Sequence, residues 1–216
     1  MPHTQAARTS AALLALLTWA ALSLQLYLSL SAHLPNVAVN FLSFFTVLSN
    51  LLVAAVLTAT ALTRTSTPPS PSFQTATAVY IAVVGLGYSL LLRHLVDLNG
   101  PHQLADSLLH DVIPVLYILL WLAFVRPRAP LPWSAAQIWL LWPAIYLTYT
   151  LVRGSRTGWY PYPFLNADTL GYPRVFAMVA ALFLAFFGLG LAAVALTRRA
   201  SPQTPLTPPA RASVGR

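Results

Sequence analysis

Residues 43–50 read Ser-Phe-Phe-Thr-Val-Leu-Ser-Asn, near the start of an apolar segment long enough to cross a membrane. At about 100° per residue on a helix, Ser43, Thr46 and Asn50 fall within roughly 60° of one another. An otherwise apolar helix therefore carries one narrow polar stripe. Because lipid offers no partner to hydroxyl or amide groups, we expect this stripe to face the protein interior.

The composition is that of an integral membrane protein. The 216-residue chain is 57% hydrophobic and only 7% charged, whereas a soluble domain carries about 25% charged residues. Its mean hydropathy is +0.69. The absence of Cys excludes a disulfide framework, a thiolate nucleophile and a Cys-based metal site. The net charge of +8 does not indicate nucleic-acid binding, because the arginines flank apolar segments instead of forming a basic patch.

The apolar segments predict an all-α, polytopic bundle of six transmembrane helices with no soluble domain. Residues 1–10 form a polar start, residues 11–197 the transmembrane domain, and residues 198–216 a tail expected to be disordered. A cleaved signal peptide is the alternative for the first segment, but its apolar run of about 20 residues exceeds the usual core of about 7–15. The expected spans are 11–30, 41–63, 76–95, 107–125, 134–152 and 173–197.

The arginine distribution favours cytoplasmic N- and C-termini. This orientation leaves eight arginines inside and four outside, in agreement with the positive-inside rule. The acidic residues are all Asp, and the chain contains neither Lys nor Glu. This bias points to a GC-rich bacterial genome and hence to a bacterial plasma (inner) membrane. The four outer arginines are Arg93, Arg153, Arg156 and Arg174.

Thr46 and His110 are expected at a similar depth. The second and fourth spans start at the same face, with Thr46 roughly 8 Å and His110 roughly 5 Å along them at 1.5 Å per residue. Residues 153–172 follow over that face and could act as a lid. We therefore expect the polar stripe to face Asp106 and His110 across a buried pocket.

The chemistry of these side chains favours nucleophilic catalysis. Asp106 and His110 are four residues apart, so the carboxylate could orient the imidazole, whereas Asp111 points about 100° away. A Thr hydroxyl needs a base to become a nucleophile, and His is the usual one. Thr46, His110 and Asp106 thus have the parts of a triad.

Structural roles remain open for the same residues. The Thr46 hydroxyl could bond to a carbonyl one turn earlier, as is common in membrane helices. Ser49 and Asn50 could tie helices together, and His110 could be a packing histidine. Tyr160 and Tyr162 are interpreted as interface anchors.

Three segments resemble a known family. Residues 44–52 (Phe-Phe-Thr-Val-Leu-Ser-Asn-Leu-Leu), residues 109–114 with Trp121, and residues 158–166 (Gly-Trp-Tyr-Pro-Tyr-Pro-Phe-Leu-Asn) are similar to the bacterial branch of the membrane proteins related to the androgen-induced and androgen-dependent hydrolases. Animal members hydrolyse fatty acid esters of hydroxy fatty acids with a membrane-embedded Thr and His. The resemblance implies that Thr46 is the nucleophile, His110 the base and a lipid ester the substrate, without a metal or nucleotide cofactor.

The resulting hypothesis is an intramembrane threonine hydrolase whose partners are membrane lipids and a lipid ester. Asn50 or Ser49 could donate to the oxyanion, and Asp106 could orient His110. Two other classes stay open: a transporter or non-catalytic scaffold, and a haem- or quinone-binding membrane protein that uses His94, His102 or His110. The sequence does not indicate an oligomeric state.

Overall fold

The computed structural model describes residues 5–33, 35–62, 69–125 and 130–199. These residues form helices joined by short connections, and no strand occurs among them. The predicted all-α class is confirmed. The prediction for the first four residues, and that for the tail beyond Arg199, lie outside the described residues.

Five helical segments of the described chain are long and apolar enough to cross a membrane. Two are single helices, α1 (Gln5–Ser31) and α10 (Tyr172–Arg199). The other three are composite and span Pro71–Leu95, Pro101–Phe124 and Ser134–Thr157.

The composite segments consist of α-helices joined to π- or 3₁₀-helical turns. The first contains α4 (Pro71–Gly87), the π-turn η1 (Tyr88–Leu92) and the 3₁₀ turn η2 (Arg93–Leu95). The second contains α5 (Pro101–Ser107), the π-turn η3 (Leu108–Val112), α6 (Ile113–Leu120) and the π-turn η4 (Trp121–Val125). The third contains α7 (Ser134–Ile138) and α8 (Leu141–Thr157), and the 3₁₀ turn η5 (Pro163–Leu165) and α9 (Ala167–Leu170) lead on to α10.

The second expected span, 41–63, is not one helix. It is divided into α2 (Val37–Leu42) and α3 (Phe45–Ala61) by an interruption at residues 43–44, where Phe44 is extended (φ −85°, ψ 127°). Seventeen residues of α-helix measure roughly 25 Å, somewhat less than a hydrocarbon core of about 30 Å. A membrane crossing by residues 41–63 therefore stays a prediction, and the prediction of one continuous polar stripe from Ser43 to Asn50 is wrong because Ser43 precedes the helix.

Several helices begin earlier than the hydropathy pattern indicates, because proline is well tolerated in a first helical turn. Pro71 begins α4, with the Ser70 hydroxyl accepting a hydrogen bond from the Phe73 N–H at 3.2 Å. Pro101 begins α5 directly after Gly100, whose positive φ of 59° reverses the chain. Pro114 consequently lies well inside the composite helix, 13 residues after Pro101.

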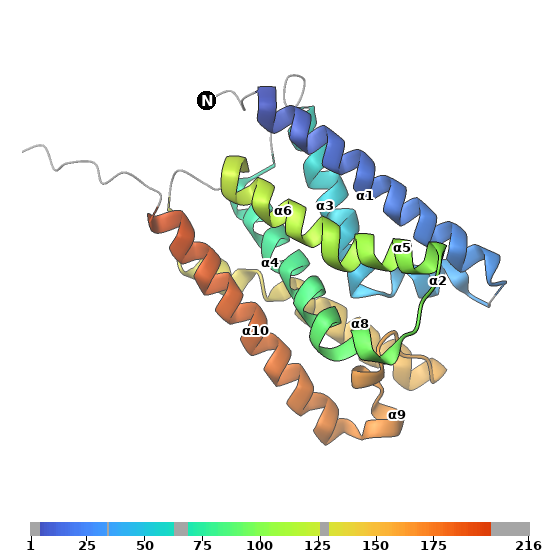
Figure 1. The fold of residues 1–216 in the computed structure, drawn as a ribbon. Helices are drawn as coiled ribbons and strands as arrows, with labels where there is room; N and C mark the ends of the chain where they lie inside the picture. The colour runs from blue at the N-terminus through green and yellow to red at the C-terminus, as the bar shows by residue number, and fades with distance from the viewer. Residues whose placement is uncertain (1–4, 34, 63–68, 126–129, 200–216) are drawn as a thin grey trace, which may run out of the picture.

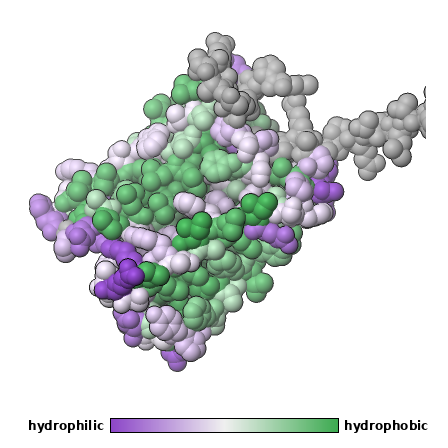
Figure 2. All heavy atoms as spheres, turned by 180° about the vertical axis from the view of Figure 1, so that it is seen from behind, coloured by the Kyte–Doolittle hydropathy of each residue, from purple (hydrophilic) through white to green (hydrophobic). Residues whose placement is uncertain are grey.

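Helix α4 lies at the centre of the bundle and packs against α3, α6 and α10 (Figure 1). Helix α3 contacts α1 most extensively, and α10 runs along the opposite side of the molecule from α1. Only 22% of the most apolar 18-residue stretch of α10 is buried inside the protein. Figure 2 shows a broad hydrophobic surface with hydrophilic residues gathered toward its edges. This surface fits a protein whose outer face is covered by lipid.

Candidate active site

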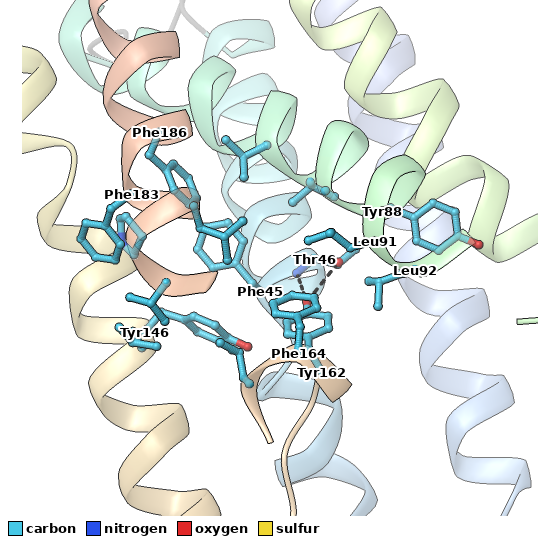
Figure 3. Close-up of a pocket in the computed structure, with 18 residues that line it drawn as sticks. Phe45, Thr46, Tyr88, Leu91, Leu92, Tyr146, Tyr162, Phe164, Phe183 and Phe186 are labelled. Carbon is cyan, nitrogen blue, oxygen red and sulfur yellow. Dashed lines mark hydrogen bonds between the residues drawn. The ribbon is translucent and has the colours of Figure 1, made fainter. Parts of the chain in front are cut away.

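Thr46 is the second residue of α3 and follows the helix interruption at residues 43–44. The first N–H groups of a helix have no acceptor within the helix. The Thr46 N–H instead donates to the Tyr162 hydroxyl oxygen at 3.1 Å, and the Thr46 Oγ1 lies 3.3 Å from the same oxygen (Figure 3). Thr46 is buried but retains 8% exposure. Both its hydroxyl oxygen and its amide therefore face the same small space.

His110 meets Thr46 across the bundle. Its Nε2 lies 3.2 Å from Thr46 Oγ1, so the two side chains expected at similar depth are in hydrogen-bond contact. His110 is presented by the π-turn η3, a type of turn that often occurs at functional sites. Pro114 lies four residues later and has no N–H to offer to the His110 carbonyl. That missing hydrogen bond accounts for a local departure from regular α-helix at this point.

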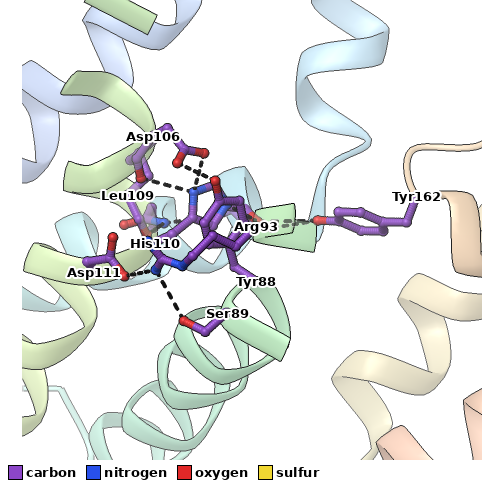
Figure 4. Close-up of polar contacts among 10 residues, drawn as sticks. Tyr88, Ser89, Arg93, Asp106, Leu109, His110, Asp111 and Tyr162 are labelled. Carbon is purple, nitrogen blue, oxygen red and sulfur yellow. Dashed lines mark hydrogen bonds and ion pairs between the residues drawn. The ribbon is translucent and has the colours of Figure 1, made fainter. Parts of the chain in front are cut away.

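The second ring nitrogen of His110 faces two acceptors. Its Nδ1 lies 3.0 Å from the Asp106 Oδ1 and 3.0 Å from the Asp106 carbonyl oxygen (Figure 4). Neither acceptor can donate, so a neutral His110 carries its hydrogen on Nδ1. The Nε2 lone pair then points at the Thr46 hydroxyl, which is the arrangement required of a general base.

Tyr88 supports this arrangement from the facing π-turn η1. Its hydroxyl donates to the Asp106 Oδ2 at 2.5 Å, and its ring stacks on the His110 ring with centroids 4.0 Å apart. Arg93 lies over the Tyr88 ring and pairs with Asp111. Asp111 therefore contacts Arg93 rather than His110, as its position on the helix predicts.

Ser49 and Asn50 do not reach the space between Thr46 and His110. Both are fully buried. The Asn50 amide donates to the Thr46 carbonyl at 2.9 Å and to the Leu109 carbonyl at 3.2 Å, and thus ties α3 to the π-turn η3. Because both hydrogens of the Asn50 side-chain amide are used in this way, Asn50 is better placed to tie helices together than to donate to an oxyanion.

Ser43 lies apart from Thr46 and Asn50 because the helix is interrupted. Its hydroxyl donates to the Val39 carbonyl at 2.6 Å and lies 2.7 Å from the Tyr149 hydroxyl. Its own carbonyl accepts a hydrogen bond from the Tyr146 hydroxyl at 3.0 Å. These bonds satisfy polar groups that the interruption exposes.

Tyr162 is the residue that sequence reasoning missed. Interpreted as an interface anchor, it is instead 8% exposed and bonded to the Thr46 backbone and side chain. Burial raises the pKa of its hydroxyl above the ordinary value, and hydrogen bonds with Thr46 partly oppose that rise. The phenol therefore stays protonated at neutral pH and can donate. The one available signal was the expected position of residues 153–172 over the face that contains Thr46.

Thr46 lies where two cavities meet. An apolar pocket with about 660 Å³ of empty space extends from Thr46 toward Phe183 and Phe186 on α10 (Figure 3). A larger cavity, termed the vestibule, has about 1660 Å³ of empty space that is partly open to the outside, and is lined by Thr46, Asp106 and His110 and by residues from the ends of α1 and α2. Four residues line both cavities: Thr46, Tyr88, Leu92 and Tyr162.

Comparison with family models, with curated proteins and with solved structures found no match. Within the described residues, no three His or Asp side chains come together as a metal site would require.

Proposed function

We propose that the protein is an intramembrane threonine hydrolase that cleaves lipid esters. One observation carries this proposal: Thr46 Oγ1 lies 3.2 Å from a His110 nitrogen whose opposite nitrogen faces the Asp106 carboxylate. A hydroxyl, a base and an orienting carboxylate in this order are the working parts of acyl-transfer enzymes on unrelated folds. The resemblance of residues 44–52 and 109–114 implies the same nucleophile and base.

In the proposed reaction, His110 Nε2 takes the Thr46 hydroxyl proton as Oγ1 attacks the ester carbonyl carbon. The tetrahedral intermediate collapses, the bond to the leaving alkoxide breaks, and His110 returns the proton to the departing alcohol. Water from the vestibule, activated by the same imidazole, then hydrolyses the acyl-threonine and restores the free hydroxyl. Asp106 stabilises the imidazolium that forms in each half-reaction.

The Thr46 N–H and the Tyr162 hydroxyl are the best placed donors for the oxyanion. The Tyr162 oxygen accepts the Thr46 N–H at 3.1 Å in the free protein, so it occupies the region where an incoming carbonyl oxygen would need donors. A substrate oxygen entering there would receive the amide hydrogen and the phenol hydrogen together. Such donors are worth about 3–4 kcal/mol each in acyl-transfer enzymes.

The two cavities fit the two ends of an ester. The apolar pocket suits an acyl chain, because its walls are almost entirely aliphatic and aromatic side chains. The vestibule is lined by apolar side chains together with Asn40, His102, Asp106 and His110, and suits the alcohol part of the lipid and water. The substrate is therefore expected to be a lipid that enters from the membrane.

Covalent labelling with a fluorophosphonate probe tests the proposal on the detergent-purified protein. Labelling should occur in the wild type and be lost in Thr46→Ala and His110→Ala. Thr148→Ala and His94→Ala are matched controls, because both side chains are exposed and line neither cavity. Equal labelling of all five folded proteins, or no labelling of the wild type, would contradict the hydrolase proposal and favour the transporter or scaffold hypothesis.

We also propose a bacterial plasma membrane location with cytoplasmic N- and C-termini, on the basis of the arginine distribution. The chain contains no Cys, so single substitutions report sidedness without background. Asn99→Cys, between η2 and α5, should react with a membrane-impermeant maleimide on intact cells. Pro130→Cys, at the opposite end of the bundle, should react only after lysis, and the reverse pattern would contradict the orientation.

A further inference from the structure

Arg153, on α8, is a cation without an acidic partner. Its guanidinium donates to the Asn40 Oδ1 at 2.5 Å and to the Ser43 Oγ at 3.2 Å, and it stacks over the Trp159 ring at 4.3 Å. All four acidic side chains of the protein lie in the described ranges. Neither of the two ion pairs found there, Arg93–Asp111 and Asp106–His110, includes Arg153.

A half-buried guanidinium without a counter-charge is an unusual arrangement. Neutral oxygens compensate less of its desolvation than a carboxylate would, because charge-assisted hydrogen bonds are roughly twice as strong. Arginine has five N–H donors in a planar fork, and the bonds to Asn40 and Ser43 use two of them. The remaining donors suit the oxygens of a carboxylate or phosphate group.

The surroundings of Arg153 connect it to the candidate active site. Trp159 packs edge-on against Phe44 with centroids 5.8 Å apart, and Phe44 packs against Tyr162 at 5.7 Å. Tyr162 in turn contacts Thr46. Trp159, Phe44 and Asn40 also line the vestibule together with Thr46, so the guanidinium lies against the wall of the cavity that contains the nucleophile.

We propose that Arg153, held in place by Asn40, Ser43 and Trp159, binds the anionic group of a lipid whose apolar part enters the vestibule. The chemistry recognised is a carboxylate or phosphate oxygen pair held by the guanidinium fork beside an aromatic ring. Tryptophan and arginine are the side chains expected where a lipid headgroup meets a membrane protein. The claim that this lipid is also the substrate rests on the proposed hydrolase function, but the binding itself does not require Thr46.

Binding is measured with the full-length Thr46→Ala protein in detergent, so that turnover cannot interfere. The probes are oleate, dioleoyl phosphatidate and the neutral methyl oleate. Oleate or phosphatidate should bind at least tenfold more tightly than methyl oleate, and the tighter of the two identifies the anion as carboxylate or phosphate. Because this protein retains Arg153, equal affinities for all three probes would by themselves overturn the proposal.

Variants of Arg153 then assign the selectivity to this residue. Arg153→Gln should lose the preference for the anionic probe and leave methyl oleate binding unchanged, whereas Arg153→Lys should keep part of it. Arg156→Gln, an exposed arginine on the same helix, is the matched control and should change neither affinity. A parallel loss for anionic and neutral probes in Arg153→Gln would show that Arg153 only holds α8 against α2, and would overturn the proposal.

The outcomes for binding and for catalysis are separable. If the wild type lacks fluorophosphonate labelling but binds the anionic probe through Arg153, the hydrolase proposal fails and the anion site stands. If labelling depends on Thr46 and His110 but no probe preference depends on Arg153, the hydrolase proposal stands and the anion site fails.

Discussion

The hydrogen-bond partners of His110 determine which of its nitrogens can act as a base. Both acceptors at Nδ1 belong to Asp106, so the carboxylate and the helix carbonyl together hold the imidazole in the tautomer that leaves Nε2 free for Thr46. Tyr88 fixes the carboxylate in turn through its hydroxyl. The orientation of the His110 ring therefore depends on one side chain from its own helical segment, Asp106, and on one from the facing segment, Tyr88.

Asp106→Asn tests this orientation. An amide can present a donor to Nδ1 and thereby favour the wrong tautomer, so we expect ester turnover to fall by about 10²–10⁴-fold. Asp111→Asn is the matched control, because Asp111 pairs with Arg93 and not with His110. Measurement of kcat for both variants on a detergent-solubilised ester is sufficient. Equal losses in the two variants would argue against a specific role for Asp106.

Tyr162→Phe tests the second oxyanion donor. The substitution removes a hydroxyl but keeps the ring stacked on Phe164 at 5.2 Å, so the fold should persist. We expect kcat to fall about 10²–10³-fold with little change in KM, because the lost bond forms in the transition state. Tyr160→Phe is the control, since the Tyr160 hydroxyl makes only a long 3.5 Å contact with Asp168. An unchanged kcat in Tyr162→Phe would remove this donor from the mechanism.

At the scale of helices, the site depends on departures from regular geometry. The interruption between α2 and α3 exposes the Thr46 N–H, and the π-turns η1 and η3 present Tyr88 and His110. Gly85 of α4 allows this close approach, because a Cβ there would lie 3.1 Å from the His110 carbonyl oxygen and 3.4 Å from the Pro114 Cβ. The backbone that presents His110 is therefore packed directly on a glycine.

Gly85→Ala should displace the His110 segment by a few tenths of an ångström. Misalignment of the base relative to Thr46 should then reduce the rate of fluorophosphonate labelling by about tenfold or more. Gly188→Ala on α10 is the control, since nothing lies within 4 Å of its added Cβ, and it should leave the rate unchanged. A normal labelling rate in folded Gly85→Ala would show that the helices can adjust around the methyl group.

At the scale of the whole molecule, α3 and the five long helical segments surround two cavities that meet beside Thr46. The apolar pocket lies between α4, α8, α10 and residues 162–165, whereas the vestibule lies between the ends of α1, α2 and α5 and residues 159–163. Residues 159–165 separate the two spaces over Thr46. This agrees with the expectation that the loop covers the face containing Thr46, and its action as a lid stays a prediction.

Gly87→Leu tests the assignment of the apolar pocket to the acyl chain. Gly87 lines that pocket and has no atom within 4 Å of an added Cβ, so a leucine side chain would occupy pocket volume without a backbone clash. Turnover of long-chain p-nitrophenyl esters should fall at least tenfold, while that of the acetate should be nearly unchanged. Gly188→Leu, outside both cavities, should affect neither ester. Equal losses for short and long chains would place the acyl chain elsewhere.

The sequence by itself determined the all-α class, five of the six expected transmembrane helices and the similar depth of Thr46 and His110. Hydropathy and helical rise are local quantities, so they can be read from neighbouring residues alone. Even the pairing of Asp106 with His110 follows from a spacing of four residues on one helix.

Only the tertiary structure decided the interruption before Phe45, the unequal roles of Tyr160 and Tyr162, and the positions of Asn50 and Arg153. Each depends on partners more than 50 residues away: Tyr162 with Thr46, Asn50 with the Leu109 carbonyl, and Arg153 with Asn40 and Ser43. A buried polar group takes whichever partner packing brings to it, because leaving it unsatisfied costs more than a local preference can recover. That choice belongs to the assembled bundle and is not contained in any single helix.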